Sequence, residues 1–93
     1  MIKPTVGRVV WFHPAAASPE TLAAIVTRVW SDGTVNLVVF SADGGSYGEH
    51  LVHLCQDDEY GNPGGGSWAE WMPYQKGQAA KTDALEALAR AVE

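Results

Sequence analysis

Residues 21–40 read TLAAIVTRVWSDGTVNLVVF, two apolar runs on either side of an Asp-Gly pair. Asp32 and Gly33 tolerate the positive φ angles of a tight hairpin turn. Both runs are rich in β-branched residues, which favour strands. They predict two antiparallel strands, at residues 21–30 and 35–40. Alternation along the first run leaves apolar residues on both of its faces, so neither face of this strand is wholly polar.

Three further strands are predicted outside this hairpin. Residues 6–13 are rich in valine and aromatic residues and end at Pro14. Residues 49–55 follow a glycine-rich turn and predict a fourth strand, and residues 68–72 predict a short fifth strand that ends at Pro73. Five short strands joined by tight turns, without alternating helices, predict a mainly β fold. The expected architecture is a small antiparallel five-stranded barrel or roll of the SH3-like kind.

The C-terminal residues change to a helical pattern. Thr82 is a candidate N-cap, and good helix formers follow it to the end of the chain. One side of such a helix carries Leu85, Leu88, Ala89 and Val92. Because so short a helix is marginal alone, this stripe needs a partner surface, either the barrel or a second copy of the chain. We expect a barrel domain at residues 1–78, a C-terminal helix at residues 79–93 that belongs to it or serves oligomerisation, and a homo-oligomer.

The composition limits the possible settings and partners. The chain has 93 residues and a net charge of -5, and its six lysines and arginines are spread thinly. Long nucleic acid is disfavoured as a partner, because non-specific affinity for it comes from many basic side chains. No apolar run reaches the roughly 18 residues of a membrane helix. The N-terminal residues lack the apolar stretch of a signal peptide, and Cys55 is the single cysteine. We therefore expect a soluble protein in a reducing, intracellular setting.

Candidate catalytic and metal-binding residues lie in unfavourable contexts. Cys55 ends a strand without an adjacent basic residue to lower its pKa, so it is interpreted as a core residue. His50 and His53 are three residues apart, which on a strand turns their side chains to opposite faces and away from a shared metal. Glu70 has no second carboxylate at a defined distance. We predict no catalytic residues, no metal and no cofactor; a hydrolase that uses His50, His53 or Glu70 is the remaining enzyme hypothesis.

A run of three glycines occupies residues 64–66. No Lys-Ser/Thr pair follows it, and the next residues are strand-like rather than helical, so the run does not match a phosphate-binding loop. We interpret it as a flexible loop that lets Trp68 reach its place. Beside a ligand it would serve as a flap.

Aromatic and arginine side chains are the best candidates for a binding site. The predicted ligand-binding residues are Arg8, Arg28, Trp68, Trp71 and Tyr74. Aromatic rings can stack on a base-like ligand, and a guanidinium group can bind its phosphate. Trp11 and Trp30 are expected in the core. Alternation turns Trp68 and Trp71 to opposite faces of the fifth strand, so at most one of the two shares a given pocket.

Four motifs are spaced along the chain: KPTVGRVVW at residues 3–11, AAIV at residues 23–26, VNL at residues 35–37 and EWMPYQKGQ at residues 70–78. Together they resemble a family of small proteins encoded in tailed-phage and prophage genomes. The resemblance covers most of the chain ahead of the C-terminal helix. It implies a phage genomic setting, the host cytoplasm and a single β domain. The family supplies no settled activity and hence no catalytic residues.

The phage setting and the aromatic and arginine residues together suggest two hypotheses. The first is a non-enzymatic phage accessory binding protein of the counter-defence kind, which sequesters a small cyclic-nucleotide-like immune signal of the host. The alternative is a protein-interaction module that inhibits a host protein or serves in phage assembly. The first rests on analogy as well as on the residues.

Overall fold

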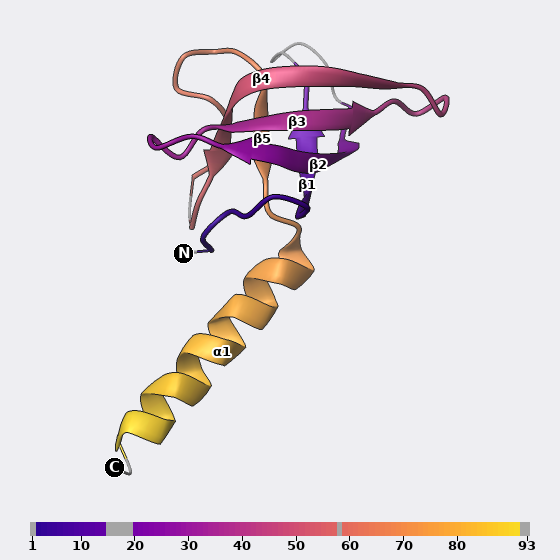
Figure 1. The fold of residues 1–93 in the computed structure, drawn as a ribbon. Coiled ribbons are helices and arrows are strands. Elements are labelled where there is room, and N and C mark those ends of the chain that lie inside the picture. Colours follow the sequence, from indigo (N-terminus) through magenta and orange to yellow (C-terminus); the bar gives the residue numbers. More distant parts are fainter. Residues whose placement is uncertain (1, 15–19, 58, 92–93) are drawn as a thin grey trace.

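The computed structural model of the chain describes residues 2–14, 20–57 and 59–91. The elements, in chain order, are β1 (Val9–His13), β2 (Leu22–Val29), β3 (Val35–Phe40), β4 (Ser46–Cys55), β5 (Trp68–Glu70) and α1 (Pro73–Ala91). The five strands close into a barrel, and α1 projects from one end of it (Figure 1). The predicted mainly β fold, a small SH3-like barrel with a C-terminal helix, is confirmed.

The sequence predicts that all strands are antiparallel, but the structure contains one parallel pair. β1 pairs antiparallel with β2 and with β5, and β3 pairs antiparallel with β2 and β4. β4 and β5 run parallel, with His53 opposite Trp68. Parallel neighbours need a connection of about a dozen residues or more, and residues 56–67 supply it. The long glycine-containing loop therefore exists because the chain must return along the barrel before β5 begins.

The barrel interior is filled by alternate residues of the strands. Val10 pairs with Ala24, and Ala24 with Val39, and all three are buried. The core cluster also contains Phe12, Leu22, Val26, Val35, Leu37, Val52, Leu54, Ala69 and Trp71. The intervening residues of β1, β2 and β3 lie on the outer face. Alternation along each strand therefore fills the core, as the period of a half-buried strand requires.

The predicted Asp-Gly hairpin is confirmed in detail. Gly33 has a φ of 89°, which glycine adopts without steric cost. Asp32 accepts hydrogen bonds from the backbone N–H and the hydroxyl group of Thr34 at 2.9 and 2.7 Å. These bonds lower the pKa of the Asp32 carboxyl group, because they favour its charged form.

The C-terminal helix begins at Pro73 and not at Thr82. Proline suits the first position of a helix, where its missing N–H would have no intrahelical acceptor. The side-chain oxygen of Gln75 accepts a hydrogen bond from the backbone N–H of Met72 at 2.8 Å, as in a capping box. The sequence predicts that a strand ends at Pro73, but the helix begins there and continues through Gly77, a residue of low helical propensity. Residues 73–78, assigned to the barrel domain from the sequence, therefore belong to α1.

The helix does not pack along its own barrel. None of its residues, all of which the structure describes, is buried, and the side chains of Leu85 and Leu88 are 66% and 63% exposed. Val92, the last residue of the predicted stripe, lies outside the described residues. The described part of the chain contains no helix with the length and apolarity needed to cross a membrane. In the structure, Leu85 and Leu88 are therefore not covered by the chain's own barrel.

Candidate functional site

A hollow of about 480 Å³ lies where the N-terminal segment, the end of β5 and the first turns of α1 meet. We call it the basal pocket. Its lining residues are Ile2, Lys3, Arg8, Trp71, Tyr74, Gln75, Gln78, Ala79, Thr82 and Asp83. A second hollow of about 320 Å³ adjoins it and shares Ile2, Trp71, Ala79 and Asp83 with it. Both hollows have the size range of small-molecule sites.

The N-terminal wall of the basal pocket is held in place by hydrogen bonds to the backbone of residues 2–8. The side-chain amide of Gln56 accepts a hydrogen bond from the N–H of Ile2 at 3.2 Å and donates one to its carbonyl oxygen at 2.8 Å. Val26 then exchanges two backbone hydrogen bonds with this segment, accepting from Gly7 at 2.8 Å and donating to the carbonyl oxygen of Arg8 at 2.9 Å. These bonds hold the backbone from which Lys3 and Arg8 extend.

The helical wall is attached to the barrel through Gln75. Its side-chain N–H donates to the carbonyl oxygen of Val9 at 2.8 Å, while its side-chain oxygen caps the helix. This double contact sets the direction in which α1 leaves the barrel. It leaves the Tyr74 ring 74% exposed at the pocket, on the first turn of the helix.

Trp71 supplies the inner wall of the pocket and carries an unsatisfied donor. Its side chain is 1% exposed and belongs to the core cluster. Its indole N–H is buried and finds no acceptor among the described residues. Leaving a buried donor without a partner costs about 1–3 kcal/mol. The pocket thus combines two cations, Lys3 and Arg8, one carboxylate, Asp83, an exposed ring and a buried donor that lacks an acceptor.

Three of the five predicted ligand-binding residues line this pocket, namely Arg8, Trp71 and Tyr74. The other two lie elsewhere. The guanidinium group of Arg28 stacks on the ring of Trp30, 3.9 Å from its centroid. Trp68 packs against His13, with ring centroids 4.0 Å apart, and against the edge of Tyr60 at 4.8 Å. The structure therefore brings together one predicted arginine and two predicted rings and separates the rest.

The burial of Trp11 and Trp30 differs from what the sequence predicts. Trp68 and Trp71 are buried, whereas Trp11 and Trp30 are only half-buried. Trp11 alternates with the inward-facing Val10 and Phe12, so it lies on the outer face of β1. Trp30 lies beyond the end of β2, and its indole N–H donates to the side-chain oxygen of Asn36 at 2.8 Å. The expectation that Trp11 and Trp30 belong to the core was wrong.

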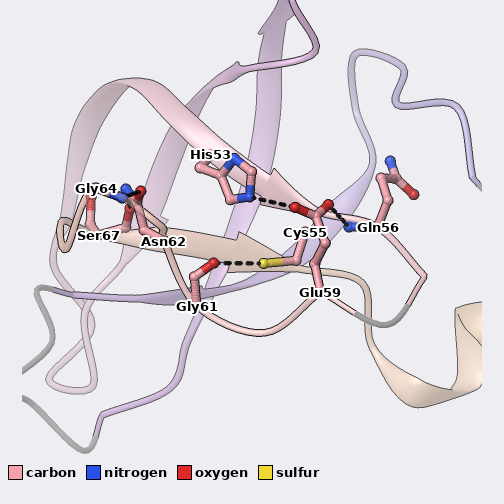
Figure 2. Close-up of polar contacts among 8 residues, drawn as sticks. All are labelled: His53, Cys55, Gln56, Glu59, Gly61, Asn62, Gly64 and Ser67. Carbon is pink, nitrogen blue, oxygen red and sulfur yellow. Dashed lines mark hydrogen bonds and ion pairs between the residues drawn. The ribbon is translucent and has the colours of Figure 1, made fainter.

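The glycine-containing loop is organised by its own hydrogen bonds and does not line the basal pocket. Asn62 accepts a hydrogen bond from the N–H of Gly64 at 2.7 Å and donates one to the carbonyl oxygen of Ser67 at 3.0 Å (Figure 2). The thiol of Cys55 donates to the carbonyl oxygen of Gly61 at 3.3 Å. Burial raises the pKa of this thiol, so it is an unreactive core cysteine. The loop packs locally and is not placed to serve as a flap over Tyr74.

His50 and His53, which are three residues apart in the sequence, lie in different surroundings. His53 lies 3.2 Å from the carboxylate of Glu59, which also accepts a hydrogen bond from the backbone N–H of Gln56 at 2.9 Å (Figure 2). His50 is exposed. Among residues 2–14, 20–57 and 59–91, no three histidine, cysteine or acidic side chains gather closely enough to hold a metal ion. Asp58, part of the acidic run 57–59, lies outside these ranges.

One polar pair was missed from the sequence. The imidazole Nε2 of His13 lies 2.6 Å from the Glu70 carboxylate, and each side chain is only 14% exposed. The hydroxyl group of Thr21 lies 3.5 Å from the other ring nitrogen. This pair joins β1 to β5, where it fixes the His13 ring against Trp68, and it does not line the basal pocket. No local signal in the sequence could have revealed it, because its partners are 57 positions apart.

We compared the chain with protein-family models, with curated proteins and with solved structures, and none of the three comparisons found a match.

Proposed function

We propose that the protein is a non-enzymatic binding protein that holds a small, anionic, nucleotide-like ligand in the basal pocket. The observation that carries this proposal is the shared lining of one hollow by Lys3, Arg8, Trp71 and Tyr74. Cations, an exposed ring and a buried donor without an acceptor are complementary to phosphate oxygens, a base and a polar edge.

Each pocket residue has a distinct task in this proposal. Arg8 forms paired hydrogen bonds with a phosphate group, and Lys3 adds a second positive charge. The exposed Tyr74 ring stacks on the base. A polar atom of the ligand that reaches the indole N–H of Trp71 would satisfy it, which requires a small opening of the pocket wall because the N–H is buried. Arg28 and Trp68 do not line the pocket and take no part in the proposed binding.

Binding without turnover fits the phage setting that the sequence resemblance implies. In that setting the protein would lower the free concentration of a host immune signal of the cyclic-nucleotide class. The His13–Glu70 pair does not line the pocket and is therefore not assigned a catalytic role. Sequestration needs only affinity, which the pocket groups can supply.

Titration calorimetry against cyclic dinucleotides, cyclic trinucleotides and cyclic ADP-ribose isomers tests this proposal. We expect at least one of them to bind, and we expect Arg8→Ala to weaken that binding by about tenfold to a hundredfold, as loss of a charge-assisted hydrogen bond predicts. Arg28→Ala is the matched control and should bind normally, because Arg28 stacks on Trp30 away from the pocket. Absence of binding by the whole panel, or equal loss in both variants, would overturn the proposal.

A second candidate function is a protein-interaction module, as the sequence also suggests. It is favoured by the exposure of Leu85 and Leu88 on a helix that buries none of its residues. A stoichiometric host partner that is lost in the Leu88→Glu variant but retained in Arg8→Ala would support this function over ligand binding.

A further inference from the structure

The first half of β4 forms an open edge of the sheet. β4 pairs with β5 only through its last three residues, 53–55, whereas it pairs with β3 from Ser46 onward. Residues 46–52 therefore have β3 on one side and none of the described strands on the other, and they reach past β5 toward the β3–β4 turn (Figure 1). We call them the β4 edge. The edge of a sheet presents backbone N–H and C=O groups with which another chain can pair.

The pairing of the β3–β4 hairpin identifies the backbone groups that face the open side. The N–H of Ser41 donates to the carbonyl oxygen of Gly45 at 2.9 Å, so these two residues form a hydrogen-bonded pair beside the turn. Hydrogen-bonded and non-hydrogen-bonded pairs alternate along an antiparallel ladder. Ser46 and Gly48, one and three positions beyond Gly45, therefore belong to non-hydrogen-bonded pairs. Their N–H and C=O groups point away from β3, to the open side.

Gly48 leaves room for a second backbone at this edge. Its φ is not in the left-handed region, so its conformation does not require glycine. Apart from the adjacent chain, a Cβ atom at this position would meet only the carbonyl oxygen of Leu37, at 4.0 Å, which is an ordinary contact. Neither conformation nor internal packing therefore accounts for the glycine. Glycine inside a strand often marks a place where another backbone approaches closely.

The outer face beside the β4 edge is apolar. Ser46 pairs with Phe40 and Gly48 pairs with Val38, and cross-strand partners point to the same face. Phe40 is 41% exposed and Val38 is half-buried. Because the β4 residues of this face are small, the two apolar side chains of β3 can be reached from beyond the edge.

The opposite face of the β4 edge is acidic. It carries Tyr47, which is 40% exposed, and Glu49, which is half-buried. Desolvation, followed by the charges of Glu49 and Glu20, raises the pKa of the Tyr47 hydroxyl group. Both carboxylates therefore lie within electrostatic reach of this ring. A positively charged side chain that approaches this face is attracted.

We propose that the β4 edge binds an extended segment of a partner protein, which adds a strand to the sheet and alternates apolar with basic residues. Backbone hydrogen bonds to Ser46 and Gly48 hold the segment, as in β-strand addition generally. Successive side chains of a strand point to opposite faces, so its apolar residues reach Phe40 and Val38 while its basic residues meet Glu49. No residue of the β4 edge lines the basal pocket, so this surface is independent of the proposed ligand site.

Charge disfavours a second copy of the chain as the added strand. Each copy would bring its own Glu49 to the same edge, and each copy has a net charge of -5. Like charges on neighbouring strands are destabilising, whereas opposite charges stabilise the pairing. The acidic face of the edge is thus complementary to a basic segment and not to itself.

Amide hydrogen exchange, measured by nuclear magnetic resonance, tests the edge on the unmodified protein. In the free protein, Ser46 and Gly48 should exchange at least about tenfold faster than Tyr47 and Glu49, whose N–H groups face β3. Saturation with a short end-capped peptide that alternates isoleucine and lysine should slow both fast amides about tenfold or more. Unchanged exchange at these amides would overturn the proposal. Slowing that grows with protein concentration in the absence of peptide would show pairing with a second copy, and would overturn it as well.

Calorimetric titration with the same peptide separates backbone pairing from charge. Gly48→Pro removes the outward N–H and places a ring on the open edge, so it should weaken binding about tenfold or more. Gly48→Ala is the matched control; it keeps the N–H and should bind within about threefold of the parent affinity. A peptide with glutamate in place of lysine should bind at least about tenfold more weakly. Equal affinity of the two variants, or of the two peptides, would overturn the proposal. The exchange measurement decides the question even where Gly48→Pro does not fold.

Discussion

His13 and Glu70 connect the first and last strands of the barrel through one short contact. The two side chains are mostly shielded from water and the imidazole ring stacks on Trp68, so each group has little freedom to find another partner. A carboxylate that loses its donor in such a place keeps its desolvation cost without compensation. The pair is therefore expected to stabilise the closure between β1 and β5.

Glu70→Ala should lower the free energy of unfolding by about 1.5–3 kcal/mol, the range for a lost hydrogen bond to a charged group, because the half-buried His13 ring then loses the partner of its Nε2 atom. His53 and Glu59 provide a matched control, because they form the same type of pair at 3.2 Å with side chains that are 30% and 47% exposed. His53→Gln should cost less than about 1 kcal/mol, since solvent screens an exposed pair. Urea denaturation monitored by tryptophan fluorescence gives both values. Equal losses in the two variants would contradict a special stabilising effect of the buried pair.

At the scale of elements, we expect the substitution of glycine by alanine to have opposite effects on stability at two positions, Gly77 and Gly33. A Cβ atom added at Gly77 or at Gly33 would meet no atom within 4 Å apart from the chain immediately around it. Gly77 lies inside α1, where alanine is the better helix former by about 0.5–1 kcal/mol. Gly33 has a φ of 89°, a conformation that alanine adopts only with strain. Gly77→Ala should therefore slow hydrogen exchange of the α1 amides by about twofold to fivefold, the equivalent of that gain.

Gly33→Ala should instead destabilise the β2–β3 hairpin by about 1–2 kcal/mol, measured by the urea midpoint. A Cβ atom has room at both sites, so a difference between the two variants reports the effect of backbone conformation and not of crowding. A gain of stability in both variants would show that the turn at Gly33 relaxes away from its positive φ.

Local patterns predicted the elements, whereas contacts distant in sequence could not be predicted. The Asp32-Gly33 turn and the strands beside it follow from propensity and turn chemistry alone. The parallel pairing of β4 with β5 depends on how the barrel closes, and alternation does not report which strand becomes the neighbour. The start of α1 was missed because Pro73 directly follows the strand-like aromatic stretch 68–72, and only the Gln75 cap reveals the helix.

The binding residues were predicted in part for the same physical reason. A list of rings and arginines identifies the side chains that can bind a ligand, and Arg8, Trp71 and Tyr74 do line one pocket. Burial decides which aromatic rings remain accessible to a ligand. The burial of each ring depends on how the barrel closes, which the local sequence does not reveal. The outer position of Trp11 requires knowing which face of β1 is inside, and both faces of this strand carry large apolar residues.

At the scale of the whole molecule, the distal part of α1 contributes little to the free energy of unfolding of the barrel. Every member of the core cluster precedes the helix, and no residue of α1 is buried. Gln75 is the residue through which the first turn of α1 is hydrogen-bonded to β1. The barrel should therefore retain its fold when the helix is shortened beyond this attachment.

A chain truncated after Gln78 should unfold cooperatively, with a free energy of unfolding of the monomer within about 1 kcal/mol of the parent value, because none of the described side chains that it loses is buried. The comparison uses a dilution at which the parent protein is also monomeric, since a dimer would add stability through mass action. Near-ultraviolet circular dichroism reports the tryptophan packing, and urea denaturation gives the energy. Leu37→Ala serves as the contrasting variant; this residue is 1% exposed in the core, and its truncation should cost about 2–5 kcal/mol. Loss of the tryptophan signal in the shortened chain would mean that α1 stabilises the barrel in a way that its exposed residues do not reveal.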